Sequence, residues 1–124
     1  MTMNLLSKTS MPFGKALRAK RLEKQFTLRK FAELVGVSPT YLSQVEQCNI
    51  VAPTADRVRR MAELLGENSD EWTALAGRVP EDLAEIFQES PTELSNLLRA
   101  VRGMTAEQLR KLRRAAERIK NDPP

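Results

Sequence analysis

The apolar residues of this chain recur every three to four positions from residue 13 to residue 119, which is the helical period. Apolar and polar residues do not alternate over any long stretch, so no strand is predicted. A first helix is expected over residues 13–24, with Phe13, Leu17 and Leu22 on its apolar face and Lys and Arg on the other. The pattern therefore predicts an all-α protein.

Short polar residues and glycines mark the limits of four more predicted helices. Thr27, Ser38, Thr54 and Ser69 are suited to cap helix starts, because their side-chain oxygens accept hydrogen bonds from free backbone N–H groups. Gly36, Gly66 and Gly77 are suited to the ends. These signals predict helices over about 28–35, from 39 to Glu46, over about 55–65, and through Trp72 to Ala76. The residues expected to face the core are Leu28, Phe31, Ala32, Val35, Leu42, Val45, Val58, Met61, Ala62, Leu65, Trp72 and Leu75.

The region after Gly77 predicts three more amphipathic helices. The first follows Pro80 and the second follows Ser90-Pro91, a cap followed by proline at the first helical position. The last follows Thr105, which forms a capping-box pattern with Gln108 and precedes apolar residues at 109, 112, 116 and 119. The predicted organisation is a flexible N-terminal arm over 1–12, a first domain over 13–77, a helical region over 78–120 and a tail over 121–124.

Composition argues against an enzyme. The 124 residues include no histidine, which removes histidine-dependent triads and the common zinc-protease motif. The acidic residues at 81, 82, 85 and 89 have no partner of catalytic type nearby, so neither catalysis nor a metal or other cofactor is expected. A single cysteine, Cys48, permits no disulfide within the chain and suits a reducing cytoplasm. The sequence has no apolar run near the roughly 18 residues of a membrane span and no secretory signal, so a cytoplasmic protein without a membrane partner is predicted.

Charge is distributed in three blocks. Residues 1–66 contain 11 basic and 5 acidic side chains, residues 67–98 contain 1 and 8, and residues 99–124 contain 8 and 3. The corresponding net charges of +6, −7 and +5 indicate that different regions meet different partners.

One stretch, LRKFAELVGVSPTYLSQVE from Leu28 to Glu46, combines the features of a tight helix–turn–helix. Ala32 is small where the two helices would cross, and Gly36 supplies the turn. With its basic first helix and its capped fourth helix, the segment 13–76 resembles the lambda-repressor/Cro-like (XRE) family of DNA-binding domains. The resemblance implies a five-helix DNA-binding domain whose third helix enters the major groove of double-stranded DNA.

The resemblance also assigns roles to individual residues. At the base-reading positions stand Pro39, Thr40, Ser43 and Gln44. Gln44 has the chemistry for a bidentate contact to adenine, and the Thr40 methyl group suits thymine. The expected contacts to the DNA backbone are Thr27, Leu28, Arg29, Lys30, Tyr41 and Arg18. For Tyr41 two interpretations remain open, a phosphate contact through its hydroxyl or a half-buried packing role.

Cys48 departs from the family pattern. Relatives commonly have glycine at this place, so either Cys48 adopts a positive φ with about 1 kcal/mol of strain, or Asn49 takes that conformation instead. The loop from Gln47 to Val51 also lacks the Arg or Lys that many relatives direct at the DNA backbone.

The second half is predicted to form homodimers, because one such domain contacts few bases and its relatives pair over two-fold sites. The dimerisation candidates are Leu94, Leu97, Leu98, Val101, Leu109, Leu112 and Ile119. Packing of these residues against the fifth helix of the same chain is the alternative. The leading function is a dimeric transcriptional repressor on an inverted-repeat operator. An antitoxin that binds a toxin through residues 78–120 is the second, and the tail also loosely resembles repressors encoded beside ImmA/IrrE-type metallopeptidases.

Overall fold

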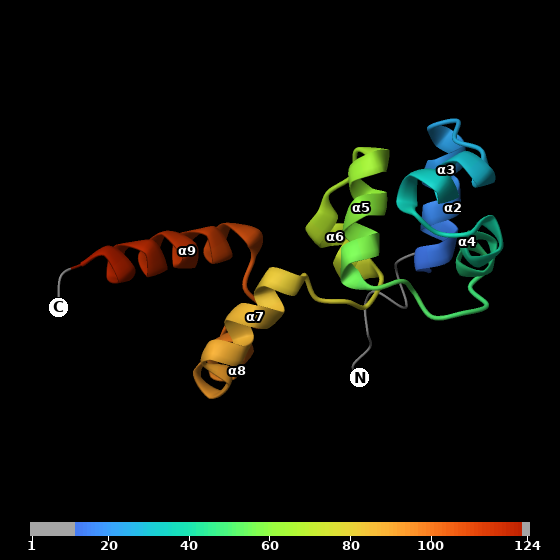
Figure 1. Ribbon diagram of the computed structural model, residues 1–124. Coiled ribbons are helices and arrows are strands. Elements are labelled where there is room, and N and C mark those ends of the chain that lie inside the picture. Colours follow the sequence, from blue (N-terminus) through green and yellow to red (C-terminus); the bar gives the residue numbers. More distant parts are fainter. Residues whose placement is uncertain (1–11, 123–124) are drawn as a thin grey trace. The chain divides into compact units, whose positions relative to one another are not determined.

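The computed structural model describes residues 12–122, and within them it contains helices and no strand (Figure 1). This confirms the all-α prediction. The predicted arm over 1–12, apart from Pro12, and the last two residues of the predicted tail lie outside the described residues. The helices are α2 (Phe13–Glu23), α3 (Leu28–Val35), α4 (Pro39–Glu46), α5 (Ala55–Leu65), α6 (Ser69–Leu75), α7 (Glu81–Glu89), α8 (Pro91–Ala100) and α9 (Ala106–Asn121).

Most predicted helix starts are confirmed by side-chain caps. The hydroxyls of Thr27, Ser38 and Thr54 accept hydrogen bonds from the backbone N–H three residues later. At α9, Thr105 and Gln108 form the complete capping box. The prediction for α6 is wrong by one residue, because Asn68 is the cap and its Oδ1 accepts from the Glu71 N–H at 2.8 Å.

Helix ends differ only slightly from the prediction. Gly36 ends α3 with φ +91°, in the left-handed region that glycine adopts without steric cost. At the other end of the chain, α9 includes Asn121, which the pattern placed outside the helix.

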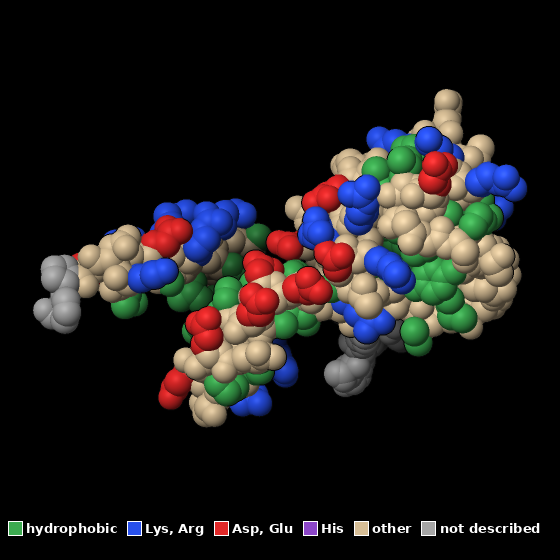
Figure 2. All heavy atoms as spheres, viewed as in Figure 1, with side chains coloured by type: hydrophobic (Ala, Val, Ile, Leu, Met, Phe, Trp, Pro, Cys, Tyr) green, Lys and Arg blue, Asp and Glu red, His purple; other side chains and the backbone are tan. Residues whose placement is uncertain are grey.

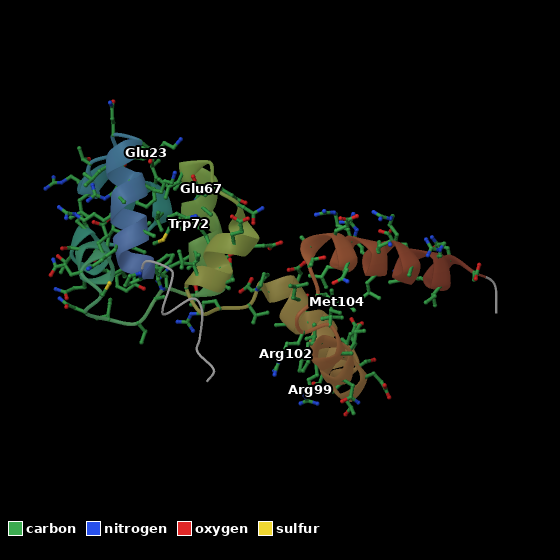
Figure 3. The ribbon with its side chains drawn as sticks, turned by 180° about the vertical axis from the view of Figure 1, so that it is seen from behind. Glu23, Glu67, Trp72, Arg99, Arg102 and Met104 are labelled. Carbon is green, nitrogen blue, oxygen red and sulfur yellow. The ribbon has the colours of Figure 1, made fainter. Side chains whose placement is uncertain are left out.

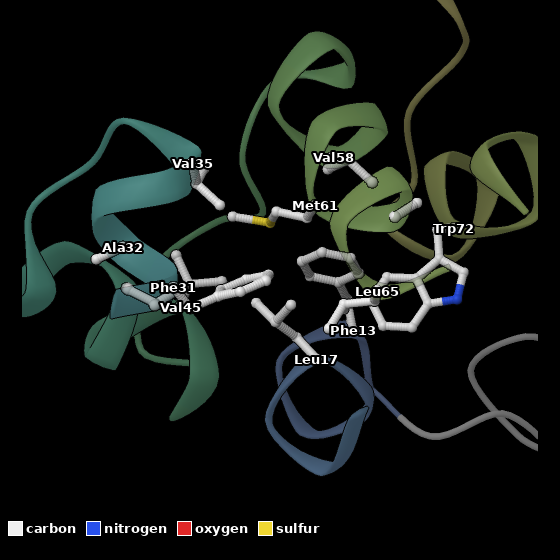
Figure 4. Close-up of a cluster of buried hydrophobic side chains, with 12 residues drawn as sticks. Phe13, Leu17, Phe31, Ala32, Val35, Val45, Val58, Met61, Leu65 and Trp72 are labelled. Atoms are coloured by element: carbon white, nitrogen blue, oxygen red, sulfur yellow. The ribbon is translucent and has the colours of Figure 1, made fainter. Parts of the chain in front are cut away.

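The core lies between α2, α3, α4, α5 and α6 (Figure 4). Phe13 from α2 meets Trp72 from α6 edge to face, with 5.8 Å between ring centroids. The buried apolar residues are Phe13, Leu17, Phe31, Ala32, Val35, Leu42, Val45, Val58, Met61, Ala62, Leu65 and Trp72. One prediction on α2 is wrong: Leu22 is 52% exposed, and the adjacent Arg21 is buried in its place.

Gly14 marks the closest approach of α2 to α4. A Cβ added at this position would lie 2.1 Å from the carbonyl oxygen of Val45 and 2.9 Å from Sγ of Cys48. Because backbone atoms cannot move aside as a flexible side chain can, only glycine fits here.

Gly14→Ala is therefore expected to destabilise the protein by about 1–3 kcal/mol, the usual cost of overpacking. Helix propensity alone would give the opposite sign, since alanine is favoured over glycine by about 1 kcal/mol inside a helix. Urea unfolding followed by circular dichroism measures the difference. Lys15→Ala, an exposed change on the same helix, is the control and should stay within about 0.5 kcal/mol. A Gly14→Ala protein more stable than its parent would contradict the close approach.

The chain divides into two compact units, one ending at Ala84 and the other beginning at Glu85. We call them the N-terminal and C-terminal units. The helices α7, α8 and α9 contain no buried residue, although each has an apolar face. None of the helices within residues 12–122 combines the length and the apolar content needed to cross a membrane.

Candidate nucleic-acid interface

The connection between α3 and α4 has the geometry of a tight turn. The Ala32 carbonyl accepts hydrogen bonds from the N–H groups of Gly36 (2.9 Å) and Val37 (3.0 Å). The Ala32 side chain is fully buried. The turn predicted at Gly36 is therefore confirmed, and the requirement for a small residue at Ala32 stays a prediction.

The two faces of α4 differ sharply in character. Leu42 and Val45 point into the core. The opposite face is accessible to solvent and contains all four residues predicted to read bases. Pro39 and Thr40 are exposed, and Ser43 and Gln44 are partly exposed. Base reading by these residues remains a prediction. It requires that they lie together on one solvent-accessible face of the helix, and they do.

A groove of about 450 Å³ runs beside this face, between α2, α3 and α4. Its lining brings together residues that the sequence could not connect: Lys15, Arg18, Arg21, Leu28, Ser43, Glu46 and Gln47. Arg18 and Leu28, predicted to contact the DNA backbone, thus share a groove with Ser43, a predicted base-reading residue. Arg29 and Lys30 are exposed at the start of α3 but do not line the groove.

Tyr41 combines packing with exposure. Its ring is partly buried against the core, and the Arg57 guanidinium lies 5.9 Å from the ring centroid, within cation–π range. Half burial, the second interpretation from the sequence, is thus confirmed. A phosphate contact through the hydroxyl stays a prediction.

A buried ion pair holds α4 against α2. Arg21 Nε donates to Glu46 Oε2 at 2.6 Å and Nη2 donates to Oε1 at 2.9 Å, a bidentate arrangement. The third guanidinium nitrogen, Nη1, donates to the Phe26 carbonyl at 2.9 Å. The hydrogen bond to Glu46 raises the pKa of Arg21, although desolvation opposes it. Sequence reasoning missed this pair. The sequence does contain a sign of it: Arg21 and Glu46 are charged residues at helix positions where the spacing of apolar residues predicts a buried side chain.

The helix-turn-helix family model matches residues 17–72, which extend from α2 into α6. This segment is similar to helix-turn-helix domains of the XRE type. Members of this family are DNA-binding domains of transcription regulators. The match includes the motif from Leu28 to Glu46, on which the sequence resemblance rests. We call the helices α2 to α6 the helix-turn-helix domain.

Two solved structures are similar to this chain over most of its length. One is the clp gene regulator ClgR from Corynebacterium glutamicum, with 26% identity, 73% of this chain and 90% of that chain covered, and a TM-score of 0.47. The other is a SinR protein/SinI protein complex, with 23% identity, 89% and 99% covered, and a TM-score of 0.45. Among curated proteins, none matches the chain significantly.

The end of α4 in the helix-turn-helix domain is a Schellman motif built on Cys48. Cys48 has φ +62°, which confirms the first of the two alternatives for this position. Its N–H donates to the Val45 carbonyl at 3.0 Å, and the N–H of Asn49 donates to the Gln44 carbonyl at 3.0 Å. The motif returns the chain alongside α4 and places Asn49 next to Gln44.

The loop that follows α4 is bound by an arginine from elsewhere in the chain, a contact that the sequence did not predict. Arg78 comes from beyond α6, and its Nε and Nη2 donate to the carbonyls of Pro53 (3.0 Å) and Ala52 (2.6 Å). The loop itself contains no basic residue, so the cation that binds its backbone carbonyls comes from a distant part of the sequence.

Several cations of the helix-turn-helix domain are already engaged within the protein. Arg59 pairs with Asp56 at 2.7 Å and Glu63 at 3.0 Å, hydrogen bonds that raise its pKa. Arg60 Nε donates to the Leu34 carbonyl at 3.1 Å. Within residues 12–122, by contrast, no carboxylate pairs with Lys15 and Arg18, which line the groove, or with Arg29 and Lys30 at the start of α3. Phosphate groups would therefore meet unpaired charge on this side.

Proposed function

We propose that the protein is a sequence-specific transcriptional repressor that binds an inverted-repeat operator as a homodimer. The observation that carries this proposal is the polar, solvent-accessible face of α4 beside the basic groove of α2 and α3. A helix of this kind reads base edges in the major groove, while flanking cations and helix N-termini contact phosphates.

Dimerisation is supported by the uncovered apolar faces of α7, α8 and α9. Leu97, Leu98 and Leu109 are each more than two-fifths exposed, and Ile119 is 75% exposed. Monomeric soluble proteins rarely leave such residues contiguous and uncovered. The other predicted dimerisation residues are also partly exposed: Leu94 lies in α8, Leu112 lies in α9, and Val101 is the C-cap residue of α8.

Charge favours a second copy as the occupant of these faces. Glu85, Glu89 and Glu93 form an acidic group at the start of the C-terminal unit. The helix α9 contains six basic residues and only two acidic ones. Figure 2 shows Lys and Arg along one edge of this helix and hydrophobic side chains along the opposite edge. A two-fold dimer is self-complementary, so a contact between the acidic group of one copy and the basic helix of the other would occur twice.

The test of the proposed site compares a base contact with a phosphate contact. Gln44→Ala is expected to relax preference at one base position per half-site, at a cost of about 1–3 kcal/mol for each lost contact. Arg29→Ala is expected to weaken binding to all duplexes alike and to reduce the salt slope by about one. Binding to a panel of single-base variants, measured at several salt concentrations, separates the two. If Gln44→Ala leaves every base preference unchanged, the assignment of the base-reading face is wrong.

The operator geometry is tested by footprinting. Two inverted half-sites are expected, with centres about 34–36 Å apart, or a multiple of that spacing, on one side of the duplex. Protection of a lone asymmetric half-site at saturating protein would contradict the dimeric mode.

An interaction protein remains the second candidate function, and the same uncovered apolar faces favour it. In that case the C-terminal unit binds a toxin, or a regulatory metallopeptidase of the ImmA/IrrE type cleaves the chain, while the helix-turn-helix domain controls transcription. Co-purification of the product of a neighbouring gene with the C-terminal unit would favour this function over simple homodimerisation.

A further inference from the structure

A chain of side-chain hydrogen bonds covers the predicted base-reading face of α4. Asn49 Nδ2 donates to Gln44 Oε1 at 3.0 Å and to Gln47 Oε1 at 3.2 Å. Gln47 Nε2 in turn donates to Ser43 Oγ at 2.8 Å. Four polar side chains are thus linked, and two of them, Ser43 and Gln44, are predicted base-reading residues.

The backbone holds Asn49 in the place that this network needs. Its N–H donates to the Gln44 carbonyl in the Schellman motif, so the main chains of the two residues are joined directly. The left-handed conformation of Cys48 makes this return possible. The position of the Asn49 amide therefore follows from the end of α4 and does not depend on side-chain freedom alone.

The direction of the hydrogen bonds decides which end of the Gln44 amide is free. Both hydrogens of Asn49 Nδ2 are donated to amide oxygens, so Gln44 turns its Oε1 towards Asn49. Among the described residues 12–122, none accepts a hydrogen bond from its Nε2, which has two hydrogens to offer to an outside partner. A free glutamine side chain presents donor and acceptor equally, whereas this one is oriented as a donor.

We propose that Asn49 is a positioning residue for base recognition, which orients the Gln44 amide so that Nε2 donates to an acceptor on a base edge. The proposal rests on the proposed function. It changes the expectation from the sequence, which was a bidentate contact to adenine. Guanine presents two adjacent acceptors, N7 and O6, and thymine presents O4, so these bases fit a donor best.

The experiment selects duplexes from a randomised pool with the full-length protein and then measures affinity for duplexes that differ at single positions. Gln44→Ala identifies the position that Gln44 reads. Asn49→Ala should reduce discrimination at that same position by about two- to tenfold and leave the others unchanged. In the Gln44→Ala background, Asn49→Ala should have no further effect on discrimination, because the amide that it orients is gone.

Asn49→Asp is the more demanding variant. A carboxylate has the shape of the amide but only accepts hydrogen bonds, so it should attract Gln44 Nε2 and turn Oε1 outwards. The preference at this one position should then move towards adenine or cytosine, whose amino groups donate. The added negative charge weakens binding to all duplexes alike and cancels in the ratio between them.

Asn96→Ala is the matched control. Asn96 is an exposed asparagine in α8 whose Oδ1 accepts from Arg99 Nη1 at 3.2 Å, so the same atoms are removed far along the chain from α4. It should change no base preference. In the free protein, the side-chain amide resonances of Gln44 should shift in Asn49→Ala and stay unchanged in Asn96→Ala.

The possible outcomes distinguish a failure of the proposed function from a failure of the positioning role of Asn49. If the wild-type protein selects no sequence, the proposed function fails. If it selects one and Gln44→Ala relaxes a position that Asn49→Ala leaves intact, the positioning role is overturned. Uniform weakening of all duplexes by Asn49→Ala would also overturn it, since that is the behaviour of a phosphate contact. A Gln44 amide resonance that is indifferent to Asn49→Ala would do so without DNA.

Discussion

Removal of the C-terminal unit is expected to lower operator affinity by about 10²–10⁴-fold while the helix-turn-helix domain stays folded. The core residues of that domain all lie between Phe13 and Trp72, so the loss removes no buried apolar side chain. A monomeric fragment must bind each half-site independently, and the gain from linking two binding events is lost. The fragment should include Arg78, because this residue holds the loop at Ala52 and Pro53 through two hydrogen bonds. It should therefore end at Ala84, the last residue of the N-terminal unit.

Sedimentation and operator titration measure this loss, and a full-length pair of variants separates dimerisation from truncation. Leu112→Gln with Ile119→Gln places amides on the apolar face of α9 and should reproduce the monomer and its weak binding. Glu117→Gln changes the polar face and leaves all six basic residues of α9 in place, so this variant should remain dimeric. A dimeric fragment that binds as tightly as the intact chain would assign the C-terminal unit to another partner.

Glu46→Gln is expected to destabilise the protein by about 3–5 kcal/mol, because it leaves the Arg21 charge buried without a carboxylate. The side chains of Arg21 and Glu46 are only 7% and 4% exposed, so solvent cannot replace the lost partner. This is a large part of the total stability of a small domain, about 5–15 kcal/mol. DNA binding should fall in parallel, since the pair fixes α4 against α2.

The exposed pair of Lys20 with Glu67 provides the matched control. Its Nζ–Oε2 distance is 3.1 Å, but both side chains are more than a quarter exposed, and Lys20 Nζ also lies 3.5 Å from Glu23 Oε1. Figure 3 labels the two glutamates, Glu23 and Glu67. Glu67→Gln should cost no more than about 1 kcal/mol. Arg21→Met combined with Glu46→Met should recover much of the stability, since an apolar pair needs no desolvation of charge. Equal effects of Glu46→Gln and Glu67→Gln in urea unfolding would contradict a special role for the buried pair.

The helices and the turn could be predicted because their signals act locally. Thr27 and Ser38 cap helices through bonds to residues only three positions away. Gly36 ends α3 through its own backbone conformation. Ala32 could be assigned to the helix crossing because its spacing from Gly36 is itself part of the motif. The common face of Pro39, Thr40, Ser43 and Gln44 follows in the same way from the helical period.

The remaining features depend on which distant segments meet, and only the tertiary structure decided them. The pattern put Leu22 on the inner face of α2, but the contact with α4 rotates Arg21 inwards to meet Glu46, 25 residues away. The same contact makes Gly14 indispensable, because the Val45 carbonyl occupies the space of a side chain. Arg78 reaches a loop 25 residues earlier in the chain. Side-chain spacing encodes which face of a helix is apolar, whereas the partner of a buried charge and the room left for a Cβ are properties of two surfaces in contact.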